Sequence, residues 1–204
     1  MRLMTIGHST LQLDELVEML RRHGVTAIAD VRSHPYSQRL PQFNRGVLAS
    51  ALEASGISYV FLGKELGGRS SDPSHYVNGK IAYAHVAKSR SFADGISRLL
   101  NGLRLYSIAL LCAEKEPLSC HRTILICRNL RRHDIDIAHI LADGSVETHS
   151  AAEQRLVQLW NLDQPSMFSS SEDLLERAYD LQGDVIAFAR SGPVNGLSAG
   201  PEGF

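Results

Sequence analysis

Two cysteines, a histidine and an acidic residue lie close together near the middle of the chain, and these residue types could support nucleophilic catalysis. Cys112 ends an apolar run, Glu114 lies in the polar loop that follows, and Cys120 and His121 come directly after that loop. A thiol near positive groups is shifted toward the thiolate, which is its nucleophilic form. An adjacent imidazole could accept or donate the proton. We therefore expect Cys112, Cys120, His121 and Glu114 to carry or support the chemistry.

An anion site is predicted at the same place, because the surrounding sequence indicates a buried strand, a loop and a helix. The strand is predicted over LYSIALLC and the helix over HRTILICRNLRRH. The first turn of a helix has unpaired backbone N–H groups and the positive end of the helix dipole, and together these bind anions. Arg122, in that turn, could add a bidentate contact to a phosphate or carboxylate.

Polar clusters also follow three other runs of strand length, LMTIG, VTAIADV and ISYVFLG. If the strands are parallel, their carboxyl ends lie at one edge of the sheet, where ligands bind. Arg32 and Arg69 could then hold an anion together with Arg122. The residues expected to bind a substrate or anion are Gly7, His8, Ser9, Asp30, Arg32, Ser37, Gly67, Gly68, Arg69 and Arg122.

Strands and helices alternate along most of the chain, which predicts a parallel sheet with right-handed crossovers. The helix over LQLDELVEMLRRHG has apolar residues at helical spacing and a glycine where it would stop. Near residue 140, the segment DIDIAHILADGSVETHS predicts two strands joined by an Asp-Gly turn. We therefore predict a three-layer, Rossmann-like α/β domain with a mainly parallel sheet, a C-terminal edge hairpin and appended C-terminal helices.

The predicted site falls within residues 1–150. Residues 151–190 are expected to form a helical extension of the same domain, and the Gly- and Pro-rich residues 191–204 to form a disordered tail. Two prolines and several polar residues predict a long loop over RSHPYSQRLPQFN. The segment KELGGRSSDPSHYVNGK is rich in Gly, Ser, Asp and Pro, so we expect a second long loop there, at the same edge of the sheet.

Composition narrows the classes of protein that this chain could represent. The 204 residues are 44% hydrophobic and 21% charged, which is typical of a globular protein with one core. A net charge of −1 gives no overall basic field for nucleic acid, and three cysteines do not make a disulfide framework. Neither a signal peptide nor an apolar run of membrane-spanning length is apparent, so we expect a cytoplasmic protein without a membrane partner.

Each candidate residue also has a structural interpretation. Cys112 could simply be packed at the end of its strand, since cysteine is among the most buried residue types. Arg122 could hold the loop by contacting Glu114 or a backbone carbonyl, and Asp30 and Arg32 could form a structural ion pair. Cys127, in the middle of the predicted helix, is expected to belong to the core.

A metal site is the rival chemistry for the same residues. Cys112, Cys120 and His121 could supply three ligands, although their spacing differs from the short Cys-x2-Cys or His-x3-His pairs of ordinary zinc sites. We therefore assign no metal ligand and predict no cofactor from the sequence, while keeping a metal-binding protein as an alternative.

Several of these motifs together resemble the domain-of-unknown-function family 488. The matching segments are TIGHST, DVRSHPYS, PQF, LGKELGGR, LLCAEKEPLSCHR and HILADG, in this order over most of residues 1–150. The ending DLLERAYDLQGDVIAF is also similar to the family's usual C-terminal segment. The resemblance implies a compact α/β domain with a polar pocket built from these motifs. It implies no established activity, since the family is named for lacking one.

Our leading hypothesis is an enzyme, a hydrolase or transferase, that acts on a phosphate-bearing small molecule, a nucleotide or a nucleic-acid end. The alternatives are an accessory protein that binds a nucleotide or nucleic acid without catalysis, and a metal-binding protein. The sequence leaves nucleic acid open as a partner, and a homodimer as well.

Overall fold

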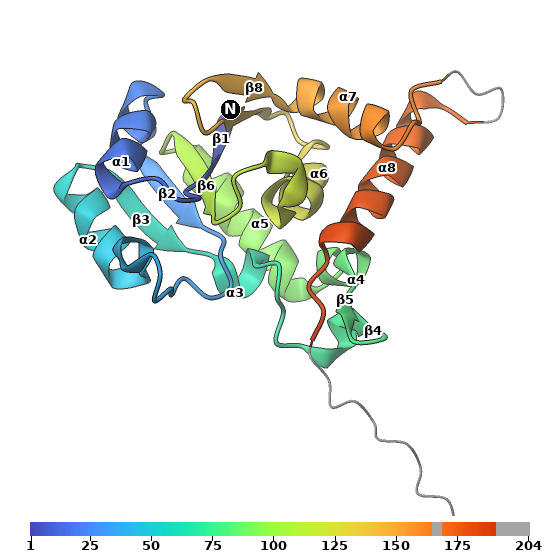
Figure 1. The fold of residues 1–204 in the computed structure, drawn as a ribbon, viewed down its shortest axis with the longest axis horizontal. Coiled ribbons are helices and arrows are strands. Elements are labelled where there is room, and N and C mark those ends of the chain that lie inside the picture. Colours follow the sequence, from blue (N-terminus) through green and yellow to red (C-terminus); the bar gives the residue numbers. More distant parts are fainter. Residues whose placement is uncertain (165–168, 191–204) are drawn as a thin grey trace, which may run out of the picture.

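The computed structural model describes residues 1–164 and 169–190, and a six-stranded sheet with the order β3-β2-β6-β1-β7-β8 forms its centre (Figure 1). The tail predicted over 191–204 lies outside the described residues. The strands are β1 (Arg2–Gly7), β2 (Ala27–Asp30), β3 (Ser58–Phe61), β6 (Ile108–Cys112), β7 (Asp136–Ile140) and β8 (Val146–Thr148). All neighbouring pairs are parallel except β7 and β8, so the predicted parallel sheet and edge hairpin are confirmed.

Helices cover both faces of the sheet and give the predicted three layers. Helices α1 (Leu13–Arg22) and α2 (Arg45–Ala54) pack on one face, against residues such as Ile28 and Leu111. On the other face, α5 (Arg90–Leu103) packs against the alternate residues, such as Leu110. Strands that are buried on both faces are apolar at every position, which is why β6 reads IALLC without alternation.

The helix that follows β6 differs from the regular α-helix expected there. A short 3-10 helix, Pro117–Ser119, comes first, then a π-helical segment, Arg122–Cys127, and only then α6 (Arg128–Leu130). Isolated π-helical turns are often found at functional sites.

The C-terminal helices pack on this irregular segment. Helices α7 (His149–Leu159) and α8 (Ser171–Ile186) form a third apolar cluster with Leu118 and Ile124. Figure 1 shows α7 next to β8, and α8 running from α7 toward α4 (Tyr83–Ala87). None of the helices in the described part of the chain has the length and apolar character needed to cross a bilayer.

The second predicted long loop is more ordered than expected. It contains α3 (Gly63–Leu66), a 3-10 turn (Pro73–His75) and a hairpin of β4 (Tyr76–Val77) with β5 (Lys80–Ile81), followed by α4 (Tyr83–Ala87). The prediction of a loop throughout was therefore wrong. Asn78 and Gly79 both have positive φ angles, 50° and 77°, which is the backbone that a tight two-residue hairpin turn requires.

The last described residues return to this hairpin. The Ile81 amide donates to the Phe188 carbonyl at 2.9 Å, and the Arg190 amide donates to the Gly79 carbonyl at 2.8 Å. This pairing brings Phe188 from the C-terminal end of the chain to the edge of the sheet where the site was predicted.

Candidate functional site

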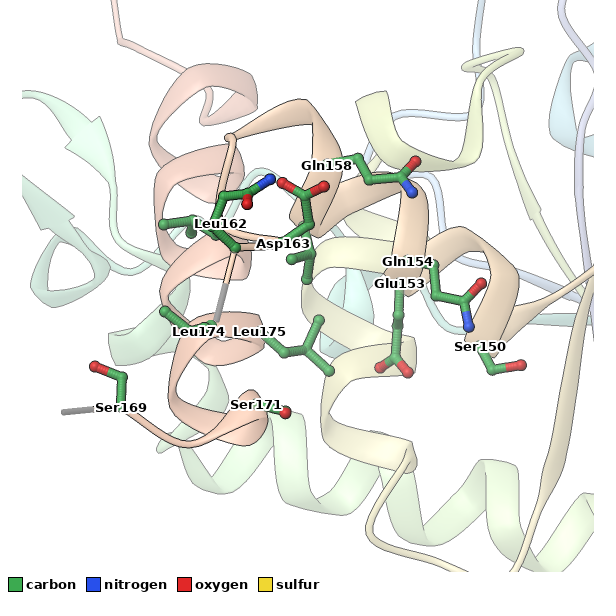
Figure 2. A pocket seen from close by; sticks show the side chains of 12 residues that line it. Ser150, Glu153, Gln154, Gln158, Leu162, Asp163, Ser169, Ser171, Leu174 and Leu175 are labelled. Atoms are coloured by element: carbon green, nitrogen blue, oxygen red, sulfur yellow. The ribbon is translucent and has the colours of Figure 1, made fainter. Parts of the chain in front are cut away.

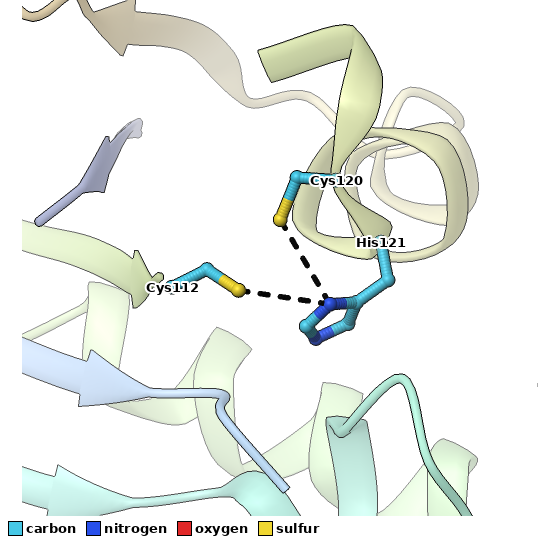
Figure 3. Close-up of side chains that lie close together, drawn as sticks. All are labelled: Cys112, Cys120 and His121. Atoms are coloured by element: carbon cyan, nitrogen blue, oxygen red, sulfur yellow. Dashed lines mark hydrogen bonds between the residues drawn. The ribbon is translucent and has the colours of Figure 1, made fainter. Parts of the chain in front are cut away.

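Two thiols and one imidazole meet at the carboxyl end of β6. Cys112 is the last residue of that strand, and Cys120 and His121 begin the helical segment that follows. The His121 Nδ1 lies 3.8 Å from the Sγ of Cys112 and 3.8 Å from the Sγ of Cys120 (Figure 3). The other ring nitrogen, Nε2, lies 3.0 Å from the Val31 carbonyl, to which it must donate. In the neutral ring, Nδ1 therefore presents its lone pair to both sulfurs.

The two thiols differ in acidity because their surroundings differ. A hydrogen bond from Cys120 holds the pKa of Cys112 well below its ordinary value, and the electrostatic influence of His121 and Arg122 acts in the same direction. Burial raises the pKa of Cys120 well above it. Burial also raises the pKa of Cys127 to about 12, and that thiol lies in the core, as expected. Of the three cysteines, Cys112 is thus the one that favours the thiolate form.

A cavity of about 370 Å³ opens over this cluster. Seven of the predicted site residues line it: Arg32, Gly68, Arg69, Cys112, Glu114, Cys120 and His121. The sequence prediction missed its other walls, which include Tyr36, Tyr83, Ile186 and Phe188. The guanidinium of Arg69 stacks over the ring of Phe188, with its carbon 4.5 Å from the ring centre. In the sequence, the segment that ends at Phe188 is notable only for its similarity to the family's C-terminal segment, and only the fold brings this residue to the site.

Arg69 is the arginine best placed to meet a ligand. Its side chain is exposed at the cavity, and no described carboxylate forms an ion pair with it. Gly68 beside it packs directly on the imidazole: a Cβ atom there would lie 2.8 Å from Cγ of His121. The glycine at 68 is therefore needed for the close approach of this loop to the cluster.

Arg32 lines the cavity but is already fully engaged. Its Nη2 and Nε donate to the two carboxylate oxygens of Asp30 at 2.6 and 2.9 Å, and its Nη1 donates to the Phe43 carbonyl at 2.9 Å. Tyr59 donates to the same carboxylate at 2.6 Å. Asp30 is fully buried, so this is the structural ion pair considered above.

Arg122 is fully buried and is not among the residues that line the cavity. Its Nη1 donates to the Glu114 carbonyl at 2.5 Å and its Nη2 to the Lys115 carbonyl at 3.2 Å. The side chain therefore holds the loop between β6 and the helix. Gly7 permits this, since a Cβ atom there would lie 1.8 Å from the Glu114 carbonyl oxygen.

A chain of buried hydrogen bonds continues behind Arg122. Its Nε lies 3.4 Å from Oγ1 of Thr5, which lies 2.8 Å from Nδ1 of His139. The Nε2 of His139 lies 3.1 Å from Nδ1 of His149, whose Nε2 lies 3.1 Å from the hydroxyl of Tyr179. The sequence indicated only His139 among these residues, as a histidine with a structural role, and did not indicate Thr5, His149 or Tyr179.

The donor and the acceptor in each of these hydrogen bonds follow from the groups at the two ends of the series. Tyr179 donates to Glu153 at 2.9 Å, and Arg131 also contacts Glu153 at 2.9 Å, so Glu153 is an acceptor. Tyr179 must then accept from His149, which accepts from His139. Each histidine is therefore neutral and carries its proton on Nε2. Burial lowers the pKa of His139 to about 3 and that of His149 to about 4.

The remaining predicted ligands lie outside the cavity. His8 is buried and stacks on Phe43, with ring centres 4.2 Å apart, and burial lowers its pKa to about 4. Ser9 has a positive φ of 42° in the turn after β1, and the Ser37 hydroxyl accepts from nearby backbone amides. Gly67 lies against Ser33, whose Oγ a Cβ atom would approach to 2.4 Å.

A larger hollow lies elsewhere, between α7 and α8 (Figure 2). Its volume is about 640 Å³, and its walls combine polar residues such as Glu153 and Gln158 with apolar ones such as Leu175. No residue predicted for the site lines it, and it lacks the cysteine and arginine chemistry of the smaller cavity.

A family model described as Domain of unknown function DUF488 matches residues 12–128, which is more than half of the chain. The match covers the cavity residues from Arg32 to His121. No curated protein and no solved structure matches the chain.

Proposed function

Because the chain belongs to the DUF488 family, whose description assigns no activity, we propose a function from the site itself: a thiol-dependent hydrolase or transferase for a small phosphate-bearing molecule such as a nucleotide. The observation that carries this proposal is the placement of Cys112, with its lowered pKa, in a cavity beside a second thiol and an imidazole. A thiolate in such a place is an effective nucleophile.

The other walls of the cavity suit the same class of ligand. Arg69 is an exposed cation that could contact a phosphate, and the aromatic rings of Tyr83 and Phe188 offer faces on which a base could stack. Arg32 and Arg122 hold the two loops that carry these groups. They are therefore proposed as positioning residues and not as ligands of the anion.

The chemistry would proceed as a nucleophilic displacement. The Cys112 thiolate attacks the phosphorus or carbonyl carbon of the ligand, and a bond to sulfur forms as the bond to the leaving group breaks. His121, when protonated on Nδ1, gives that proton to the leaving group. Water or a second acceptor then displaces the thiolate and completes hydrolysis or transfer.

A panel of nucleotides and simple phosphate esters tests the proposal by calorimetry and by product formation in a reducing buffer. Arg69→Ala is expected to weaken binding by about tenfold, the loss of one charge-assisted hydrogen bond. Arg90→Ala is the matched control, because Arg90 is exposed and does not line the cavity. Cys112→Ser is expected to retain binding and to lose turnover. If no member of the panel binds, the proposal is refuted; if binding occurs without turnover, the protein is an accessory binding module.

A metal-binding function has one observation in its favour. The ligand atoms of Cys112, Cys120 and His121 all lie within 4.8 Å of one another, and the Nε2 of His121 donates to a backbone carbonyl, as in most histidines that bind a metal. These residues would supply three ligands to a cation such as Zn²⁺, which prefers thiolate sulfur and imidazole nitrogen. Elemental analysis of protein purified without chelator tests this, and a metal content that survives in Cys112→Ser would argue against it.

A further inference from the structure

We propose that Cys112 and Cys120 are a site of reversible oxidative modification, in which a hydroperoxide that enters the cavity converts the two thiols into a disulfide. This inference rests on the proposed function only in needing a reactive Cys112 thiol. It does not depend on which phosphate-bearing ligand the cavity accepts.

The geometry of the pair carries the inference. Figure 3 shows both sulfurs directed at the same ring nitrogen of His121, and the two Sγ atoms lie within 4.8 Å of each other. A disulfide needs a separation of about 2.05 Å, so the two side chains together must close a gap of less than roughly 3 Å. Both thiols line the cavity, so a small oxidant in it meets the pair directly.

The two cysteines lie in different elements, and backbone hydrogen bonds anchor each of them. The Cys112 carbonyl accepts from the His8 amide at 2.9 Å, which fixes the end of β6. Cys120 lies between a 3-10 turn and the π-helical segment, and its amide donates to the Pro117 carbonyl at 3.2 Å. The movement needed for closure therefore falls mainly on Cys120, at a junction between two irregular helical turns.

The reaction balances with the hydroperoxide as the only co-reactant. The Cys112 thiolate attacks the distal oxygen, the O–O bond breaks, and an alcohol or water leaves after it takes a proton. The sulfur is then a sulfenic acid. Cys120 attacks that sulfur, a disulfide forms, and the sulfenic oxygen leaves as water with the proton from Cys120. A dithiol reductant returns both thiols.

Cys127 provides an internal comparison. It is also buried, but it lies in the core under the helical segment, has no part in the cavity lining, and has a pKa raised by burial. If oxidant reacted with every buried thiol, Cys127 would be oxidised too. If the reaction depends on the pair, Cys127 should remain reduced.

The test treats the full-length protein with equimolar hydrogen peroxide, with a chelator present so that a bound cation cannot shield the thiols. Intact mass should fall by two hydrogens, and a non-reducing peptide map of the unmutated protein should show Cys112 joined to Cys120. Cys120→Ser should instead give a sulfenic acid at Cys112 that dimedone traps. Cys127→Ser should behave as the unmutated protein, and Cys112→Ser should react at least about tenfold more slowly, because the cavity thiol that remains, Cys120, is only 1% exposed.

Two results would overturn the inference: a peptide map in which Cys112 takes up oxygen without linking to Cys120, or an equal reaction rate in Cys112→Ser. The peptide map needs no variant, so a folding defect in a mutant leaves it decisive. Failure of the proposed enzymatic function appears separately, as absence of ligand binding in reducing buffer. A disulfide that forms in a protein that binds no ligand would therefore support this inference alone.

Discussion

At the scale of single residues, two glycines differ in whether a side chain would fit: a Cβ atom has no room at Gly68 but has room at Gly46. A Cβ atom at Gly68 would lie 2.8 Å from Cγ and 3.0 Å from Nδ1 of His121, whereas nothing lies within 4 Å at Gly46. Gly68→Ala must therefore displace the imidazole from the two sulfurs. We expect it to slow alkylation of Cys112 by iodoacetamide several-fold and to lower stability by about 1 kcal/mol.

Gly46→Ala is the matched control for this change, because Gly46 lies in the first half of α2, where alanine is tolerated or favourable. Its alkylation rate should equal that of the unmutated protein. Alkylation at the same rate in Gly68→Ala would mean that the imidazole does not influence the thiol.

The buried ion pair of Asp30 and Arg32 leads to a prediction about stability. Asp30→Asn leaves the Arg32 charge without its carboxylate in a site that is 8% exposed, and removing one partner of a buried pair costs about 3–5 kcal/mol. Tyr59→Phe removes only one hydrogen bond to the same carboxylate and should cost about 1 kcal/mol. Urea unfolding at pH 7 measures both values, and similar losses for the two variants would contradict the assigned roles.

At the scale of elements, the hydrogen-bond chain joins β1, β7, α7 and α8 behind the site. Its direction requires His139 and His149 to be neutral with the proton on Nε2, which nitrogen chemical shifts of the two rings can test directly. Tyr179→Phe removes the hydroxyl between His149 and Glu153 and should cost about 1–3 kcal/mol, because the buried His149 Nε2 is left with only the more distant Glu153 carboxylate, 3.5 Å away.

In Tyr179→Phe the proton positions on His139 should persist, since that ring keeps Thr5 and His149 as partners. If the ring nitrogens of the unmutated protein report an Nδ1 proton on either histidine, the proposed direction of the chain is wrong.

The strands and the pair of cysteines were predictable because they depend on local pattern. Apolar runs of strand length predicted the strands of the parallel sheet. Cys112, Cys120 and His121 lie together at the end of one of these strands, as expected. For Arg32 and Arg122 the sequence left two roles open, anion binding and structural support, and only the folded loops, which present carbonyl partners to both, decide for support. The position of Phe188 in the site could not be predicted from local sequence pattern, because it depends on pairing with a hairpin more than 100 residues earlier in the chain.

At the scale of the whole molecule, three buried histidines should make stability fall in mild acid. Burial lowers the pKa of His8 and His149 to about 4 and that of His139 to about 3, and the positive charges of Arg32, Arg122 and Arg131 act in the same direction. The ordinary value in an unfolded chain is about 6.5. Below that pH the unfolded chain binds protons that the folded protein cannot accept, so the free energy of unfolding decreases.

The contribution of the three neutral histidines to the free energy of unfolding should therefore be complete above about pH 7. It should be lost as the pH falls from about 6.5 toward 4. At pH 5 the loss is about 2 kcal/mol per histidine. Urea unfolding between pH 7.5 and 4.5, a range chosen to bracket roughly this window, measures the slope. In His149→Gln the protein should be less stable at pH 7 but lose about one-third less on acidification, because one of the three groups that drive the loss is gone. A free energy of unfolding that stays level across this range would show that these rings are protonated, or exposed, in the folded protein.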